Sequence, residues 1–216
     1  MAMREMKKYP LDETIETNIN LPNHYIYFTL KNTADFLMAL LGLVILSPIL
    51  LLFVLAIKLE SNGPAFFLQE RVGLNGRVFN IIKLRSMYID AEKNGAQWAK
   101  KNDARVTKIG AFIRRTRIDE IPQLINMLKG DMSLVGPRPE RPIFTEQFNK
   151  EIPGFKNRIV VKPGITGWAQ VNGGYDISPK EKLEFDIYYI KNLSLFMDVK
   201  IIFKTIKVIF TGEGAR

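Results

Sequence analysis

The sequence predicts a helix-dominated α+β protein in which a small domain follows a membrane helix. Three observations carry this prediction: a long uncharged apolar run near the amino end, two β-rich segments around an Asn-Gly pair, and several helical runs further on. We expect a tail over residues 1–32, a membrane helix over 33–60 and a domain at the membrane interface over 61–216.

The amino-acid composition limits the catalytic chemistry that this chain can perform. The formal net charge is +9, which favours anionic partners such as nucleic acid, acidic lipid headgroups or phosphorylated substrates. Cysteine is absent, which excludes disulfides and thiolate catalysis. The one histidine, His24, lies in the amino-terminal tail, which argues against a histidine zinc site or a Ser-His-Asp triad. The chemistry must therefore rest on carboxylates, lysines and arginines, with or without a hard metal ion.

Residues 36–57 carry no charged side chain and are long enough for a helix to cross roughly 30 Å of hydrocarbon. The alternative, a buried helix of a soluble protein, rarely stays apolar on every face. Ser47-Pro48 lies at the middle, where proline kinks a helix and the serine hydroxyl can bond a carbonyl one turn earlier. The basic residues that follow place the main domain in the cytoplasm, and those of the tail favour the same side. Physics alone leaves a spanning helix and a helix that re-enters the same face equally open.

After Ala65, two β-rich runs flank Asn75-Gly76, a pair that tolerates the positive φ angles of a hairpin turn. Residues 90–105 are polar and predict a mobile loop, and Thr107 precedes a short helical run. The two segments rich in glycine and proline, 133–142 and 161–174, are expected to be loops.

The carboxyl end, 195–210, predicts an amphipathic helix. Its apolar face carries Val199, Ile202, Phe203, Ile206 and Phe210, and its lysines are Lys200, Lys204 and Lys207. Such a helix either lies in the interface with its lysines toward anionic headgroups or docks on its own domain.

The candidate site centres on two adjacent carboxylates, Asp119 and Glu120, which we expect at a helix start because Pro122 is tolerated only in a first turn. The helix dipole and nearby arginines should lower a carboxylate pKa there and keep it ionised, able to attack phosphorus or hold Mg²⁺. Acidic residues in a first turn are also common as simple caps. The basic side chains expected to bind phosphate around this pair are Lys83, Arg85, Arg114, Arg138 and Lys162.

From residue 33 onward the sequence resembles the bacterial sugar transferases, the monotopic phosphoglycosyl transferases. The resemblance rests on the Ser47-Pro48 helix and on four runs: GPAFFLQERVGLNGRVFNIIKLRSM, RRTRIDEIPQLINMLKGDMSLVGPRPERP, KPGITGWAQVNGG and FDIYYIKNLSLFMDVKII. The chain looks like the small form of the family. One departure is Arg117, where relatives often have serine.

The resemblance implies a re-entrant helix bent at Ser47-Pro48, amphipathic interfacial helices and an active site on the cytoplasmic face of the bacterial inner membrane. It also implies that Asp119 attacks the sugar-bearing phosphate of a UDP-sugar and releases UMP, after which undecaprenyl phosphate takes the sugar phosphate. Mg²⁺ would lie near the carboxylate pair, with Asp119 as a ligand, and Glu120 would act on the metal environment or on protons. The reaction would be the first membrane step of capsule, exopolysaccharide or glycoprotein glycan synthesis.

Two other readings compete with this one. A membrane-anchored basic module would explain the charge but not the carboxylate pair, and a phosphatase with an aspartyl-phosphate would need no polyprenol acceptor. We expect anionic phospholipid as a partner and no nucleic acid. The sugar and a homo-oligomeric state stay open.

Overall fold

The computed structural model describes residues 25–91, 93, 95, 103–173 and 177–211, the last three without their side chains. The tail before residue 25, much of the 90–105 segment and the side chain of Phe210 therefore lie outside the described residues. Within them the fold is helix-dominated α+β with a β-hairpin, as predicted, and it also contains a second two-stranded sheet.

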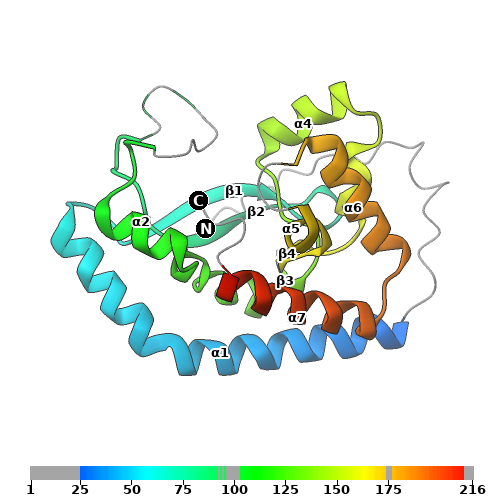
Figure 1. Cartoon of the computed structure of the whole chain (residues 1–216), viewed down its shortest axis with the longest axis horizontal. Coiled ribbons are helices and arrows are strands. Elements are labelled where there is room, and N and C mark those ends of the chain that lie inside the picture. Colours follow the sequence, from blue (N-terminus) through cyan, green and yellow to red (C-terminus); the bar gives the residue numbers. More distant parts are fainter. Residues whose placement is uncertain (1–24, 92, 94, 96–102, 174–176, 212–216) are drawn as a thin grey trace, which may run out of the picture.

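The apolar run lies in α1 (Tyr25–Glu60), a helix that begins earlier than the predicted membrane segment. It is long and apolar enough to cross a membrane, and most of its surface is exposed. Figure 1 shows α1 running beneath the other elements and then turning upward toward its carboxyl end. Pro48 lies inside the helix, and the Ser47 hydroxyl donates to the Val44 carbonyl at 2.8 Å, one turn earlier, as expected.

The hairpin joins β1 (Phe66–Val72) to β2 (Val78–Leu84) in antiparallel register, with Phe66 opposite Leu84. A 3₁₀ turn, η1 (Leu74–Gly76), connects the strands. Asn75 and Gly76 adopt φ angles of 52° and 77°, which confirms the predicted turn. Because side chains alternate along a strand, the two faces of this hairpin serve different surroundings.

Three short helical elements follow. The first is α2 (Lys108–Arg115), which begins where the Thr107 side chain accepts a hydrogen bond from the Gly110 amide at 2.9 Å. The 3₁₀ turn η2 (Ile118–Glu120) and α3 (Gln123–Leu128) come next. Asp119 and Glu120 thus lie in a 3₁₀ turn before α3, not in its first turn.

The prediction of two loops was wrong in part, because strands form inside them. β3 (Ser133–Val135) pairs in parallel with β4 (Gly164–Thr166), and α5 (Trp168–Gly173) follows β4. A Cβ on Gly164 would lie 2.1 Å from the Gly136 amide nitrogen, so glycine permits this close approach. The amides of Gly136 and Gly164 donate to the Thr166 and Pro137 carbonyls, so these two amides are not available to bind an anion.

The remaining elements are α4 (Pro142–Glu151), the 3₁₀ segment η3 (Phe155–Val160), α6 (Pro179–Lys191) and α7 (Leu195–Thr211). Figure 1 shows α7 beside the amino-terminal half of α1. Tyr27 and Lys31 of α1 both donate to Oδ2 of Asp198 on α7, each at 2.9 Å. The carboxyl-terminal helix therefore docks on its own domain, although Phe196 and Phe203 remain 79% and 68% exposed.

Helix α1 contributes to three separate hydrophobic clusters. Tyr27 packs with Tyr189 and Ile201, whereas Ala39 belongs to a cluster with Met127 of α3. The third cluster joins Ile57 to the hairpin and to α2, through Ala65, Leu84 and Ile113. The domain thus packs against α1 near both of its ends and near its middle.

Candidate active site

The two carboxylates are held in the turn between α2 and α3. Arg117 adopts a left-handed φ of 58°, which turns the chain out of α2 and into η2. The Glu120 amide then donates to the Arg117 carbonyl at 3.0 Å and closes the turn. Asp119 and Glu120 are only 8% and 7% exposed. Two adjacent ionisable groups are therefore taken out of bulk water, which needs cationic partners.

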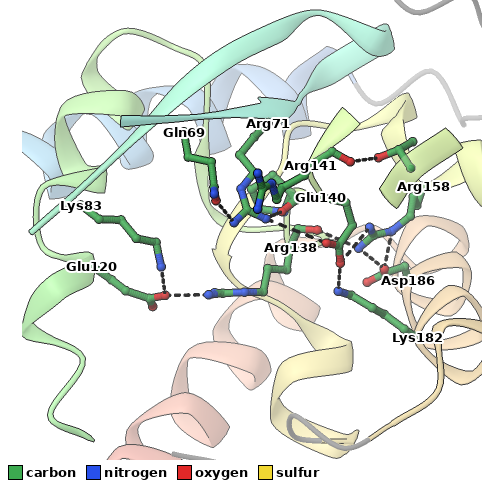
Figure 2. A network of polar contacts seen from close by, with 12 residues as sticks. Gln69, Arg71, Lys83, Glu120, Arg138, Glu140, Arg141, Arg158, Lys182 and Asp186 are labelled. Carbon is green, nitrogen blue, oxygen red and sulfur yellow. Dashed lines mark hydrogen bonds and ion pairs between the residues drawn. The ribbon is translucent and has the colours of Figure 1, made fainter. Parts of the chain in front are cut away.

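Two cations meet the pair from distant parts of the chain. Lys83 of β2 and Arg138 of the loop after β3 both donate to Oε1 of Glu120, at 2.9 and 2.8 Å (Figure 2). Lys83 also lies 3.8 Å from Oδ2 of Asp119. The structure thus brings together four of the residues that the sequence predicted for the site.

The two carboxyl groups are shifted in opposite directions. Burial would raise the pKa of Glu120, but Arg138 and Lys83 hold it well below the ordinary range. For Asp119, burial is the largest effect and raises its pKa, and Glu120 raises it further, against the opposing effects of Lys83 and Arg138. The predicted low pKa of Asp119 was therefore wrong, because burial of this carboxyl outweighs its cations and Glu120 takes the close hydrogen bonds.

Both carboxylates line a cavity of about 450 Å³. Its walls come from the hairpin, the segment after β2, η2, the loop after β3 and the start of α6. Basic side chains dominate its polar lining: Arg71, Lys83, Arg85, Arg105, Arg114, Arg117, Arg138, Arg141 and Lys182. Such a lining suits a ligand with more than one negative charge.

Of the other residues predicted to bind phosphate, two line the cavity and one does not. Arg114 lines the cavity, and its charge acts on Asp119. Arg85 also lines the cavity, but its guanidinium donates to the Ser61 and Asn62 carbonyls at 2.7 Å each and so ties the hairpin to the end of α1. Lys162 is not brought to the cavity, because its ammonium donates to the Asn32 side chain of α1 at 2.9 Å.

Sequence reasoning missed a second network behind Arg138, drawn in Figure 2. Arg158 of η3 donates to the Arg138 carbonyl at 2.8 Å and forms an ion pair with Asp186 at 2.6 Å. Glu140 pairs with Lys182 and lies near Arg71 and Arg158. These partners hold the pKa of Glu140 at about 2 despite its burial. The spacing of charges in the sequence carried no signal of this network, since its members come from four segments: β1, the loop after β3, η3 and α6.

An apolar helix joined to a basic cavity that holds two buried carboxylates is typical of proteins that handle phosphorylated substrates at a membrane. The chain belongs to the bacterial sugar transferase family, whose model matches residues 26–212.

Curated relatives agree with this assignment. The chain is 52% identical over 194 residues to the UDP-N-acetylgalactosamine-undecaprenyl-phosphate N-acetylgalactosaminephosphotransferase of Aeromonas hydrophila, covering 88% of this chain and 46% of the relative. It is 40% identical over 218 residues to the UDP-glucose:undecaprenyl-phosphate glucose-1-phosphate transferase of Escherichia coli, covering 99% of this chain and 46% of that protein. The chain thus spans about half the length of these two relatives.

Proposed function

We propose that the chain transfers a sugar-1-phosphate from a UDP-sugar to undecaprenyl phosphate and releases UMP, the first membrane step of glycoconjugate synthesis. The observation that carries the proposal is the buried Asp119–Glu120 pair on the wall of a cavity lined with cations. The substrates named for the relatives support it, and the 52% identical relative makes UDP-N-acetylgalactosamine the first donor to test. UDP-glucose, named for the 40% identical relative, is the second.

The proposed transfer consists of two half-reactions. In the first, a carboxylate oxygen of Asp119 attacks the sugar-bearing phosphorus, the bond to the bridging oxygen breaks, and UMP leaves with the electron pair. In the second, a phosphate oxygen of undecaprenyl phosphate attacks the same phosphorus, the bond to Asp119 breaks, and the carboxylate is regenerated. Asp119 suits the role of nucleophile because it lines the cavity while Glu120 takes the close hydrogen bonds of Lys83 and Arg138.

Glu120 is proposed to orient the two cations. Lys83 and Arg138 share its Oε1 atom and so hold their remaining N–H groups near the position of a transferring phosphoryl group. Arg114, on the wall beside Asp119, adds positive charge to the same region. Removing the charge of Glu120 would weaken its hold on both donors, because only a neutral acceptor would remain.

The donor set fits Mg²⁺. This ion commonly binds proteins through one or two carboxylates, with waters and substrate phosphates completing its shell. Asp119, which lines the cation-rich cavity, is the residue that would hold the ion, together with the phosphates of the substrate. When bound, the ion would neutralise phosphate charge and lower the pKa of Asp119.

We further propose that α1 is re-entrant and that the protein is monotopic, on the cytoplasmic face of the bacterial inner membrane. Tyr27 and Lys31 bind Asp198 near one end of α1, and Ile57 packs on Ile113 near the other. A helix that crossed roughly 30 Å of hydrocarbon would carry one of these ends away from the domain. Contacts of a single domain with both ends of the helix support a helix that enters and leaves by one face.

The exposed apolar side chains of α7 support an interfacial position for that helix. Val199, Phe203 and Ile206 are exposed, while Met197 and Ile201 on another face pack in the core. Lys200 and Lys204 lie 5.2 and 4.6 Å from the centre of the Trp168 ring, so their charges lie beside an aromatic side chain. We therefore propose anionic phospholipid as the partner of this surface.

The proposal is tested by trapping the intermediate. Wild-type protein and the Asp119→Asn variant are incubated with UDP-N-acetylgalactosamine or UDP-glucose and Mg²⁺, without undecaprenyl phosphate, and the intact protein mass is measured. Wild type should gain one sugar-phosphate adduct, release UMP, and lose the adduct when undecaprenyl phosphate is added. Asp119→Asn should keep its fold but should neither gain the adduct nor release UMP. Product without any adduct would show direct transfer between substrates, and Asp119 would then be only a metal ligand.

A further inference from the structure

A second cavity lies against the hairpin. It is a groove of about 600 Å³, and all six of its lining residues are apolar: Pro64, Phe66, Phe67, Leu68, Ile82 and Ile125. Leu68 is 59% exposed, and Phe66 and Phe67 are each 40% exposed, so the groove exposes apolar side chains to the surroundings. The neighbouring cavity, by contrast, is lined with basic side chains. Exposure of this kind marks a surface that meets another apolar molecule.

The strand register places three lining residues of the groove, Phe66, Leu68 and Ile82, on one face of the hairpin, whereas Phe67 lies on the opposite face. Leu68 pairs with Ile82 and Phe66 pairs with Leu84, so these four side chains share a face. Leu84 packs with Ile57 of α1 in the core. The face that carries the groove therefore meets α1 near its carboxyl end, so the groove lies beside the helix that we assign to the membrane. The opposite face also packs with α1, further along the hairpin, where Phe79 and Ile81 share a cluster with Ala39.

Side chains on the opposite face of the hairpin line the reaction cavity. Lys83, between Ile82 and Leu84, points the other way and donates to Glu120, and Gln69 and Arg71 of β1 line the same cavity. Pro64, Phe66 and Phe67 line both cavities, so the two hollows meet at this end of the hairpin. An amphiphile lying across this end would have its charged group among the cations and its tail in the groove.

We propose that the groove binds the isoprenoid chain of the polyprenyl phosphate acceptor, next to its phosphate. This inference rests on the proposed function, since it names the place of the second substrate. The argument for a polyprenyl phosphate is the continuity of an entirely apolar groove with a cavity that binds phosphate, because the acceptor combines these two chemistries in one molecule. A groove for the acceptor alone should have no effect on the first half-reaction.

Leu68 is the residue to change, because it lies in the groove and outside the lining of the reaction cavity. Leu68→Gln makes the groove polar, whereas Leu68→Trp fills it and keeps it apolar. Ile143→Gln is the matched control, since Ile143 of α4 is also 59% exposed and lines neither cavity. Each protein is assayed with undecaprenyl phosphate as acceptor, and its adduct yield is measured without acceptor.

Both Leu68 variants should raise the KM for undecaprenyl phosphate roughly tenfold, in line with the loss of one buried apolar contact. The KM for the UDP-sugar and the yield of adduct without acceptor should stay as in wild type. An unchanged KM in both variants, or an equal change in Ile143→Gln, would overturn the proposal. Loss in Leu68→Gln with normal activity in Leu68→Trp would also overturn it, because the groove would then be inserting into the bilayer.

A photoactivatable undecaprenyl phosphate analogue separates this proposal from the proposed function. Crosslinking to peptides that contain Leu68 or Ile125 needs no turnover, so it supports the groove even if no UMP is released. Crosslinking confined to α1 and α7 would place the acceptor elsewhere, even in a protein that forms the adduct normally.

Discussion

Lys83 and Arg138 meet at one atom: both donate to Oε1 of Glu120, at 2.9 and 2.8 Å. One residue comes from the hairpin and the other from the loop after β3, so Glu120 is the point at which two distant segments are joined. Asp119, by contrast, has its nearest cation at 3.8 Å. The two adjacent carboxyl groups therefore differ in their close partners and in the direction in which their pKa is shifted.

The first prediction concerns pH. Burial raises the pKa of Asp119 above its ordinary 3.8, and UMP release at a fixed Mg²⁺ concentration should fall in acid as the proposed nucleophile becomes protonated. Lys83 lowers this pKa, so Lys83→Met should move the acid limb to still higher pH. Single-turnover UMP release measured against pH checks this, with the exposed Lys150→Met as control. An acid limb that stays in place in Lys83→Met would contradict it.

The second prediction concerns Arg138. Arg138→Ala should lower the rate roughly 10- to 100-fold, because a hydrogen bond to a charged group contributes about 1.5–3 kcal/mol. Arg138→Lys should lose less, since it keeps the charge but not the planar set of donors. Steady-state rates with both substrates measure the difference. Normal rates in both variants would assign Arg138 a structural role.

The third prediction concerns Glu120. Glu120→Gln keeps the shape of the side chain and removes the charge that holds Lys83 and Arg138, so turnover should slow strongly. Asp119 is still present, so the sugar-phosphate adduct should form in the variant. Mass measurement with and without undecaprenyl phosphate follows both steps. Full loss of the adduct would show that Glu120 is needed already in the first half-reaction.

The fourth prediction concerns stability in acid. The pKa of Glu140 is held at about 2, below its ordinary 4.5, so its ionised form stabilises the folded state above pH 4.5. This stabilisation, on the order of 3 kcal/mol, should be lost as the pH falls from 4.5 toward 2. Glu140→Gln should flatten this part of the unfolding midpoint measured against pH in detergent. The same slope in wild type and variant would contradict the assignment.

The fifth prediction concerns topology, and the absence of cysteine makes it simple to test. Thr29→Cys and Asn62→Cys place single thiols at exposed positions near the two ends of α1. If α1 is re-entrant, a membrane-impermeant thiol reagent should label both in inverted vesicles and neither in right-side-out vesicles. Pro48→Ala should straighten the helix and move some molecules into a spanning form. Labelling of the two positions from opposite sides would exclude the re-entrant helix.

Local sequence patterns were sufficient to predict the elements whose structure depends on residues nearby in the sequence. The apolar run, the Asn75-Gly76 turn and the Thr107 cap were all correctly predicted. The pairing of β3 with β4 was not, because two strands of three residues within segments rich in glycine and proline show no alternation, and only their partner across the chain makes them strands.

The candidate site was likewise predicted only in part from the sequence. Lys83, Arg114 and Arg138 were identified by charge near a carboxylate pair, and they line its cavity. The raised pKa of Asp119 was not foreseen, because burial is set by the packing of distant segments and not by adjacent charges. Lys162 was expected near phosphate because of its glycine-rich neighbourhood, whereas the fold uses those glycines for strand pairing and the lysine for α1.

The contacts of α1 have a consequence for how this protein can be made and handled. Its side chains supply one buried member of each of three hydrophobic clusters: Tyr27, Ala39 and Ile57. A fragment beginning at residue 61 would open all three clusters to water at once, so we expect it to aggregate on expression. Insertion into lipid and completion of the catalytic core are then a single assembly event, and a detergent that strips α1 of its apolar surroundings should inactivate the enzyme as well as extract it.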